Sequence, residues 1–530
     1  MNNSIIKYVS LSVFSTLILV SCGSGGVGSN DFDDPVGNQT FSAGDLDVTR
    51  YVALGDSLTA GFKDRSLYLD GQLDSMPNIL SQAFAEVGGG EFTQPLAKDN
   101  LGGLLLMGNP ISSAPTRLVL VENPNYDPSS PVSQQFLPSN QSGTPTTEIG
   151  IPLTGAFNNL GVPGAKSFHL AAPSYGDVAG LLTTPATANP FFVYFASSTT
   201  TTVLSDALTQ SPTFFTLWIG NNDILGYGTT GGDGSDPITP PANDMANSFP
   251  VNFEDTYNGI VGALTASGTN SVQGALINIP SITSIPFFTA IRYDIIYMSQ
   301  AQADAANLAY TAYNNGLDTA VGLIANAAVF SQVEADSRKI SFSAGFNPAV
   351  ILDEGLTDLP AINGALSALL QWRQTTPNDF ILLTAPVGQE RVAGDPTTVA
   401  GVGSALNDDE VLLEAEAAEI EAARQAYNAT ILAAANANPN LVHVDVSTLL
   451  ADVADSDGFN YGTGTVTSVF GTGGAFSLDG VHPTARGYAI VSNLVVDTLN
   501  DAFNAELPRT DPATYTETFF EFPAGFDFSP

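Results

Sequence analysis

Four short, almost wholly apolar segments are the strongest constraint on the fold of this chain. They cover residues 50–54, 214–219, 274–280 and 441–446. Continuous apolar runs of this length, unlike alternating ones, are typical of strands that are buried on both faces. Stretches with helical spacing separate them, at 76–87, 252–266, 301–326, 408–436 and 484–503. This alternation predicts an α/β fold with a parallel central sheet that helices cover on both faces.

The charge and the rare residue types exclude several classes of function. The chain has 53 Asp and Glu against 15 Lys and Arg, a formal net charge of -38. Such a surface repels phosphate backbones and anionic headgroups, so no nucleic-acid partner is expected. One cysteine and three histidines exclude a disulfide scaffold, a cysteine-rich zinc site and an iron–sulfur cluster. A histidine-based active site has only His169, His443 and His482 to draw on.

The sequence predicts one elaborated domain, over residues 47–505, between two terminal segments. Residues 22–46 are rich in Gly, Ser, Asn and Asp and predict a flexible tether. Residues 506–530 are expected to form a C-terminal tail. Large insertions are predicted where the strand–helix alternation is interrupted, near residues 88–150, 226–250 and 327–405.

Residues 1–21 have the pattern of an export signal. A short polar start with Lys7 precedes an apolar run over 8–20, which is too short to span a bilayer. The run ends in Leu-Val-Ser-Cys22, followed by Gly23, and resembles the lipobox of bacterial lipoproteins. That resemblance implies lipidation of Cys22 and anchoring in the bacterial envelope, at the outer membrane, on its periplasmic or its surface-exposed face. The alternative is an ordinary signal peptide with an incidental cysteine.

The first apolar segment runs directly into Gly55-Asp56-Ser57-Leu58. A serine on a strand-to-helix turn exposes its hydroxyl at the sheet edge, with its N–H near a helix N-terminus where anionic charge is stabilised. Thr59 excludes the G-x-S-x-G elbow of α/β-hydrolases. Asp56 and Ser57 are also residue types that cap an ordinary helix, which is the structural alternative.

Further motifs follow at wide intervals. Asn159-Leu-Gly-Val-Pro-Gly164 is a glycine-containing turn, and Gly220-Asn-Asn222-Asp223 follows the second apolar segment. Asp479-Gly-Val-His482 lies just before the last helical stretch. An Asp-x-x-His spacing lets the carboxylate and the imidazole lie along one turn, so the carboxylate can orient the ring. The structural alternatives are a turn, a polar loop and a helix N-cap.

Together these motifs resemble the sequence blocks of the GDSL, or SGNH, hydrolase family over about residues 49–503. The resemblance implies a three-layer α/β/α, flavodoxin-like fold with a parallel central sheet. It also implies that Ser57 is the nucleophile, His482 the general base and Asp479 the residue that orients the base. No metal and no cofactor are implied.

The resemblance assigns an oxyanion hole as well. Its donors are the N–H of Ser57, the N–H of Gly164 and the side chain of Asn222, with Gly161 as the second choice for the glycine. His169 and His443 lie outside the motifs, so structural roles are expected for both.

The resulting hypothesis is a serine ester hydrolase, a lipase or carboxylesterase that acts by two-step acyl transfer on a lipid, a small ester or an acetylated glycan. The alternatives are a polysaccharide O-deacetylase of the same fold and a non-catalytic surface lipoprotein scaffold. The chain departs from the family in size, because 425 positions separate Ser57 from His482. Apolar clusters at 104–107, 191–195 and 285–288 either line an acyl pocket or belong to the core.

Overall fold

A five-stranded parallel sheet forms the centre of the computed structural model, which describes residues 40–232, 252–266, 271–324 and 326–518. Its spatial order is β15-β8-β7-β1-β6, and every neighbouring pair is parallel. The strands are β1 (Tyr51–Gly55), β6 (Asn159–Gly161), β7 (Phe214–Trp218), β8 (Gln273–Ile277) and β15 (Leu441–Val444). The predicted α/β class with a parallel central sheet is confirmed. The sequence patterns predicted four of these strands and missed β6.

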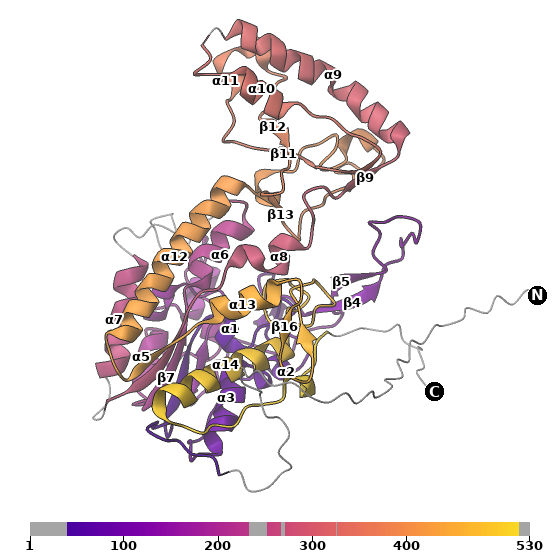
Figure 1. Ribbon diagram of the computed structural model, residues 1–530. Coiled ribbons are helices and arrows are strands. Elements are labelled where there is room, and N and C mark those ends of the chain that lie inside the picture. Colours follow the sequence, from indigo (N-terminus) through magenta and orange to yellow (C-terminus); the bar gives the residue numbers. More distant parts are fainter. Residues whose placement is uncertain (1–39, 233–251, 267–270, 325, 519–530) are drawn as a thin grey trace, which may run out of the picture. The chain divides into compact units, whose positions relative to one another are not determined.

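Side chains of successive strand residues enter two separate hydrophobic cores, one on each face of the sheet. Val52 and Leu54 of β1 lie in the core with helices α5, α7 and α12, whereas Tyr51 and Ala53 lie in the core with α3 and α14. Figure 1 shows these two groups of helices on opposite sides of β7. Their bounds are α5 (Val203–Leu208), α7 (Phe253–Ala266), α12 (Glu414–Asn436), α3 (Met76–Ala85) and α14 (Ala485–Phe503). Because both faces are covered, the strands must be apolar along their whole length.

Shorter elements complete this part of the chain. The helices that connect and flank the strands are α1 (Ser57–Ala60), α2 (Leu69–Leu73), α4 (Pro190–Val193), α6 (Asn221–Thr229), α8 (Pro286–Thr289) and α13 (Val446–Ala454). Small antiparallel pairs join β2 (Leu105–Leu106) to β3 (Asn109–Pro110), β4 (Leu118–Glu122) to β5 (Phe136–Asn140), and β16 (Phe459–Asn460) to β17 (Thr465–Val466).

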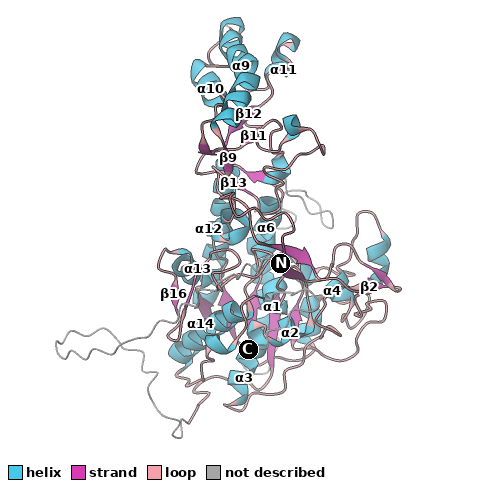
Figure 2. Cartoon of the chain, turned by 90° about the vertical axis from the view of Figure 1, so that its right-hand side faces the viewer, coloured by secondary structure: helices cyan, strands magenta, loops and turns pink. Residues whose placement is uncertain are grey.

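The segment between α8 and α12 has a hydrophobic core of its own, made by residues from Ile296 to Leu413. Its helices are α9 (Gln300–Leu323), α10 (Gln332–Arg338) and α11 (Leu359–Ile362), shown with its short strands in Figure 2. The strands are β9 (Ile296–Met298), β10 (Gly345–Asn347), β11 (Val350–Leu352), β12 (Trp372–Gln374), β13 (Phe380–Ile381) and β14 (Val411–Leu412). The insertion therefore starts earlier than the predicted 327 and includes the long helix α9.

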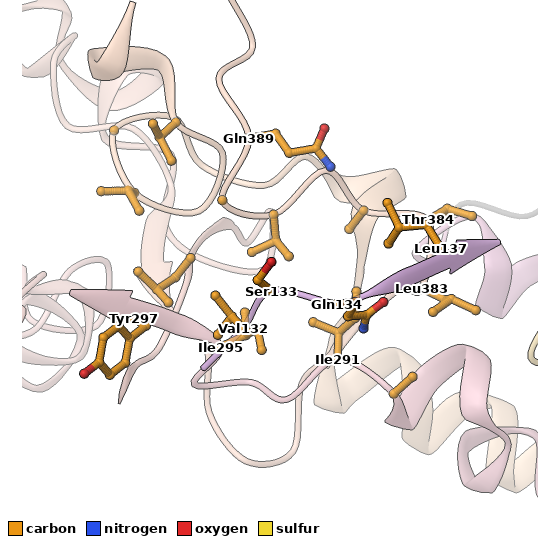
Figure 3. Close-up of a pocket in the computed structure, with 18 of the residues that line it drawn as sticks. Val132, Ser133, Gln134, Leu137, Ile291, Ile295, Tyr297, Leu383, Thr384 and Gln389 are labelled. Atoms are coloured by element: carbon orange, nitrogen blue, oxygen red, sulfur yellow. The ribbon is translucent and has the colours of Figure 1, made fainter. Parts of the chain in front are cut away.

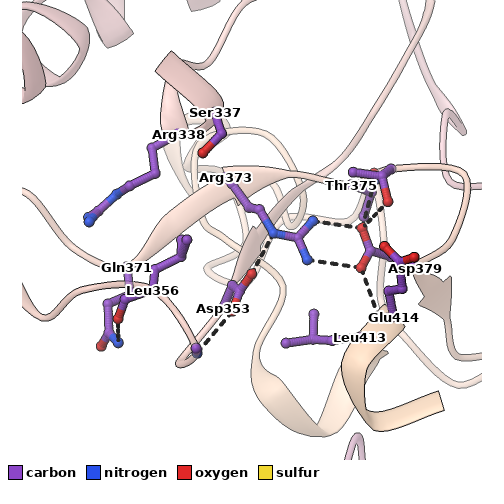
Figure 4. Close-up of polar contacts among 12 residues, drawn as sticks. Ser337, Arg338, Asp353, Leu356, Gln371, Arg373, Thr375, Asp379, Leu413 and Glu414 are labelled. Atoms are coloured by element: carbon purple, nitrogen blue, oxygen red, sulfur yellow. Dashed lines mark hydrogen bonds and ion pairs between the residues drawn. The ribbon is translucent and has the colours of Figure 1, made fainter. Parts of the chain in front are cut away.

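A largely buried ion-pair network ties this insertion to the start of α12. The Arg373 guanidinium donates through Nε to Asp353, at 2.5 Å, and through Nη1 and Nη2 to the two oxygens of Asp379, at 2.6 and 2.9 Å (Figure 4). Asp379 Oδ1 also accepts from the backbone N–H of Glu414. Burial alone would raise the pKa of Asp379, but the charge and hydrogen bonds of Arg373 hold it below its usual value. The carboxylate thus stays ionised and fixes β12 against the first residue of α12.

The ordered body extends beyond the predicted domain limits at both ends. At the N-terminal end, the N–H of Asp45 donates to the carbonyl of Phe503, at 2.8 Å, and Leu46 is buried. At the C-terminal end, Leu507 is buried and the N–H of Thr510 donates to Asn493. Residues 40–46 and 506–518, predicted as tether and tail, therefore pack on the body.

The remaining predicted segments have mixed outcomes. Residues 88–150 contain β2 to β5 and contribute Leu104 and Ile149 to a small separate core. Of the predicted insertion at 226–250, residues 226–229 belong to α6, and 233–250 lie outside the described residues. The predicted signal, Cys22 and most of the tether also lie outside them. No helix within the described ranges is both long and apolar enough to cross a bilayer.

Candidate active site

Ser57 begins α1 directly after β1, and the local sequence explains why the chain turns there. Asp56 caps the helix, because its Oδ1 accepts from the N–H of Leu58 at 2.9 Å. Gly61 ends the single turn in a left-handed conformation, with φ of 81°. The helix-cap reading of Asp56 is therefore right, and the same cap holds the Ser57 hydroxyl at the carboxyl edge of the sheet.

His482 and Asp479 meet Ser57 in one chain of hydrogen bonds. His482 Nε2 lies 2.8 Å from Ser57 Oγ, and His482 Nδ1 lies 2.9 Å from Asp479 Oδ2. The three side chains are largely enclosed: Ser57 is 7 % exposed, and the side chains of His482 and Asp479 are 13 % and 9 % exposed. The structure thus brings the three predicted residues together across 425 positions of sequence.

Asp479 is held as an anion. Its Oδ1 accepts from the N–H groups of Val481 and His482, and its Oδ2 accepts from the N–H of Arg65. Burial would raise the pKa of this carboxyl, but the charge of His482 and these hydrogen bonds outweigh burial and lower it to about 2. The alternative that Asp479 caps the last helix is wrong, because Thr484 is the N-cap of α14.

Arg65 reaches Asp479 from a strained turn that the sequence did not reveal. Asp64 and Arg65 both have positive φ, of 53° and 62°, which is costly for side chains other than glycine. The turn persists because Asp64 is anchored: its N–H donates to Ser477, and its carboxylate accepts from the N–H of Leu478 and the hydroxyl of Tyr68. Residues 63–66 therefore fix the segment that carries Asp479. No motif marks this turn.

Both backbone N–H groups of the predicted oxyanion hole lack a protein acceptor among the described residues. Within the described residues, neither the N–H of Ser57 nor that of Gly164 donates to a protein acceptor. The N–H of Gly161, in contrast, donates to the side chain of Asn159 at 3.0 Å. A Cβ atom at Gly161 would lie 2.3 Å from the N–H nitrogen of Ala60, so this glycine is required for close packing on α1. Gly164, with φ of 78°, is therefore the glycine of this turn whose N–H has no acceptor among the described residues.

Asn222 lies in the first turn of α6, directly after β7. Its Nδ2 donates to the carbonyl of Ala165, at 3.0 Å, which places the side-chain amide against the turn that contains Gly164. The second N–H of the amide has no acceptor among the described residues. Asp223 fixes the same turn, since its buried carboxylate accepts from the N–H and hydroxyl of Ser167 at 2.8 and 2.5 Å.

Asn221 was missed by the sequence reasoning. It is buried, and its Nδ2 donates to Asp56 Oδ2 at 3.0 Å. Burial raises the pKa of Asp56 to about 6, against the hydrogen bonds from Leu58 and Asn221, which lower it. The contact joins the serine turn to the start of α6. Its only sequence signal is the paired asparagine in Gly-Asn-Asn-Asp.

The other two histidines contact residues outside the hydrogen-bonded chain of Ser57, His482 and Asp479. His169 is buried, accepts at Nδ1 from the N–H of Lys166 and stacks on Tyr175, with ring centroids 4.5 Å apart. His443 lies within β15, where burial lowers its pKa. Of the three histidines, only His482 makes a hydrogen bond with the Ser57 hydroxyl.

One group of carboxylates has the spacing of cation ligands. Oxygen atoms of Glu354, Asp408 and Glu416 lie within 4.8 Å of one another. Burial, together with the neighbouring charges of Glu354 and Asp408, raises the pKa of Glu416 to about 7. Protonation of Glu416 would therefore relieve the repulsion among these carboxylates.

Comparison of the chain with known protein families, with curated proteins and with solved structures finds no match.

Proposed function

We propose that this protein is a serine ester hydrolase that acts by acyl transfer through Ser57. The observation that carries the proposal is the hydrogen-bonded chain from Ser57 through His482 to Asp479, at 2.8 and 2.9 Å, beside two N–H groups without acceptors among the described residues. A nucleophile, a base, an orienting carboxylate and oxyanion donors are the four parts that this chemistry needs.

In the proposed acylation step, Ser57 Oγ attacks the ester carbonyl carbon and its proton moves to His482 Nε2. The carbonyl oxygen becomes an oxyanion, which the N–H groups of Ser57 and Gly164 and the side chain of Asn222 bind. Asp479 stabilises the imidazolium because its carboxylate faces Nδ1. His482 then gives the proton to the departing alcohol oxygen, and an acyl-enzyme remains.

Water completes the proposed cycle. His482, neutral again, takes a proton from a water molecule that attacks the acyl carbon, and the same donors bind the second oxyanion. When the tetrahedral intermediate collapses, the proton returns from Nε2 to Ser57 Oγ and the carboxylic acid leaves. The hydrogen bonds of Ser57, His482 and Asp479 support these steps.

We further propose membership of the SGNH hydrolase family and its three-layer, flavodoxin-like fold. Numbered in chain order among themselves, the five sheet strands follow the order 2-1-3-4-5, which is the order of that fold class. In such sheets ligands bind beyond the carboxyl ends of the strands, where the strand order reverses. Ser57 and Asn222 follow the two strands β1 and β7 that flank this reversal, which supports the family motifs.

We also propose that the protein is a lipoprotein of the bacterial outer membrane, anchored through Cys22. The support is the lipobox-like end of the apolar run and the position of Cys22 as the only cysteine. A lipid anchor would keep the enzyme at a membrane surface, although the acidic chain itself is repelled by anionic headgroups.

Labelling with a fluorophosphonate tests the proposed function without assuming a substrate. The reagent should modify the parent protein at Ser57, identified by mass spectrometry of the peptide, and should leave Ser57→Ala unmodified. The parent should also hydrolyse p-nitrophenyl acetate, and the variant should lose nearly all of this activity while its circular dichroism stays the same. His443→Gln serves as a matched control that keeps both labelling and activity. A folded Ser57→Ala protein with most of its activity would place the nucleophile elsewhere, and an unlabelled, inactive parent would favour the non-catalytic scaffold.

A further inference from the structure

A cavity of about 1950 Å³ opens beside the candidate active site. Its walls come from the β4–β5 hairpin and the insertion between α8 and α12, together with α8 itself, residues 468–470, the loop of residues 478–482, and Phe62 and Arg65. Figure 3 shows side chains from the first two parts around the same space, among them Leu137, Ile291 and Leu383. The cavity is larger than the few hundred to about 1000 Å³ of ordinary small-ligand pockets.

The cavity touches the candidate site from one side only. His482, Asp479 and Val481 line it, and so does Phe62, whose ring centroid lies 4.8 Å from that of His482. Ser57, Gly164 and Asn222 are absent from its lining. The cavity therefore adjoins the general base and not the oxyanion donors.

This one-sided contact determines which half of an ester the cavity can hold. In acyl transfer the imidazole that accepts the serine proton later donates it to the leaving oxygen, so the leaving alcohol must lie on the histidine side. The oxyanion points instead toward the donors at Ser57, Gly164 and Asn222. A cavity that adjoins His482 thus lies where the alcohol part of the substrate leaves.

The room for the acyl part is small by comparison. The Ser57 side is nearly closed, with the residue 7 % exposed. A second cavity, lined by Ala60 and Gly161 among others, holds about 10 Å³, which is the space of one water molecule. Short acyl groups fit this arrangement better than long ones.

The lining indicates an apolar, uncharged occupant. It consists mainly of aliphatic and aromatic side chains, and its polar members are amides and hydroxyls such as Gln134, Thr384 and Gln389. Arg65 and Asp479 are the only Arg, Lys, Asp or Glu residues of the lining, and Asp479 is already bound to the imidazole. In a chain with 53 acidic residues, a wall that contains no other carboxylate is distinctive. Each methylene of a ligand that is buried against such a wall strengthens binding.

Resting on the proposed function, we infer that the preferred substrates are esters of a short acyl group with a large, uncharged, apolar alcohol. The alcohol, a long-chain or lipid alcohol, occupies the cavity between the β4–β5 hairpin and the insertion, while the acyl group stays beside Ser57. Specificity therefore depends on the β4–β5 hairpin and the insertion, both of which lie outside the motifs.

Two isomeric esters test this orientation directly. Hexadecyl acetate and ethyl palmitate have the same formula and similar hydrophobicity, but the long chain is on the alcohol in the first and on the acyl group in the second. Presented at equal mole fraction in detergent micelles, hexadecyl acetate should have a kcat/KM at least about tenfold higher, since pocket contacts with even single methylenes reach this size. Equal values or a preference for ethyl palmitate would overturn the inference.

Paired variants locate the binding wall. Leu137→Asp places a charge on the cavity wall, and Leu182→Asp makes the same change at an exposed leucine outside the lining. Ala309→Trp fills the cavity from α9, and Ala301→Trp is its control two turns earlier on the same helix, exposed and outside the lining. Only the lining variants should lower kcat/KM for hexadecyl acetate, by about tenfold or more, and none should change it for ethyl acetate. Equal effects of a lining variant and its control would contradict the assigned site.

The remaining outcomes separate this inference from the proposed function. Faster release of acetate from acetylated xylan than from hexadecyl acetate would replace the apolar alcohol by a glycan and overturn the inference. The proposed function itself fails if fluorophosphonate does not label Ser57 and no ester is cleaved, or if folded Ser57→Ala keeps most of the activity. A labelled, active enzyme without any preference for hexadecyl acetate overturns the inference alone.

Discussion

Replacing Asp479 by asparagine changes a single heavy atom of the candidate site, because one carboxylate oxygen becomes an amide nitrogen. The introduced amide can still accept at its oxygen from the N–H groups of Val481 and His482, which Asp479 Oδ1 does at 2.9 and 2.8 Å. The amide nitrogen, however, faces the N–H of Arg65 and His482 Nδ1, where the carboxylate oxygen accepted. The imidazole then accepts at Nδ1 and carries its proton on Nε2, so it cannot take the proton of Ser57. We expect kcat to fall by roughly 10⁴, as for the same change in a serine triad of known mechanism.

The same substitution has a stability cost that depends on pH. The pKa of Asp479 is about 2 in the folded protein against a reference value of 3.8. At about 1.4 kcal/mol for each pKa unit, the ionised carboxylate contributes roughly 2 kcal/mol to folding. Because the folded value is the lower one, this contribution is full above the reference pKa of 3.8 and is lost as the pH falls toward about 2. Asp479→Asn should therefore be less stable than the parent at neutral pH, by a margin that narrows in acid.

Two measurements check this prediction. Turnover of p-nitrophenyl acetate gives the change in kcat, and urea unfolding at pH 7 and at pH 3 gives the two differences in unfolding free energy. A variant that keeps more than about a tenth of its turnover would refute the orienting role, since a wrong tautomer leaves far less. A stability difference that stays the same at both pH values would refute the assignment of a depressed pKa to Asp479.

Two further changes test other parts of the proposals. Asn222→Ala should lower kcat by about 10² to 10³ with little change in KM, because one oxyanion donor acts mainly in the transition state; unchanged kinetics would exclude Asn222 from the oxyanion hole. Cys22→Ala, expressed in a bacterial host, should incorporate no labelled palmitate and should leave the membrane fraction; equal labelling of variant and parent would refute the lipid anchor.

The sequence predicted those parts of the fold that burial alone determines. The apolar runs at 50–54, 214–219, 274–280 and 441–446 became β1, β7, β8 and β15 with ends that differ by only a few residues. Strand β6 was missed because Asn159–Gly161 is three residues long and contains one large apolar side chain. Its position was found only through the motif that it begins.

The predicted extent of the insertion differs from the structure for a different reason. The pattern of α9 shows that one side of the helix is buried, and the prediction of a helix at 301–326 is confirmed. Periodicity does not reveal which part of the protein the buried side of α9 packs against. Here it packs in the core formed by residues from Ile296 to Leu413. Similarly, the helix predicted from residue 408 begins at Glu414, because Val411 and Leu412 pair with Phe380 and Ile381 as strands. Such pairings join distant residues and leave no local pattern.

The motifs predicted the residues of the candidate site but not what holds them. Ser57, His482 and Asp479 were all predicted and lie in one hydrogen-bonded chain. The supports of this chain are Asn221 under the serine turn and the Asp64–Arg65 turn under the aspartate. Asn221 acts through its buried side chain, whereas Arg65 acts through its backbone N–H. A backbone donor can belong to almost any residue type, so it leaves no trace in the sequence. Sequence alone therefore gives no signal for Arg65.

The connections of the sheet separate the proposed chemistry from the proposed specificity. Ser57 follows β1, Gly164 follows β6 and Asn222 follows β7, whereas the insertion follows β8 and ends at α12. All of these connections leave the carboxyl edge of a parallel sheet, where added residues do not disturb strand register. The insertion has a core of its own, although its Leu382 and Leu412 pack in the core with Val52 and Leu54. On the proposed function, changes in the insertion should therefore alter which alcohol is accepted while the acyl-transfer chemistry at Ser57 stays the same.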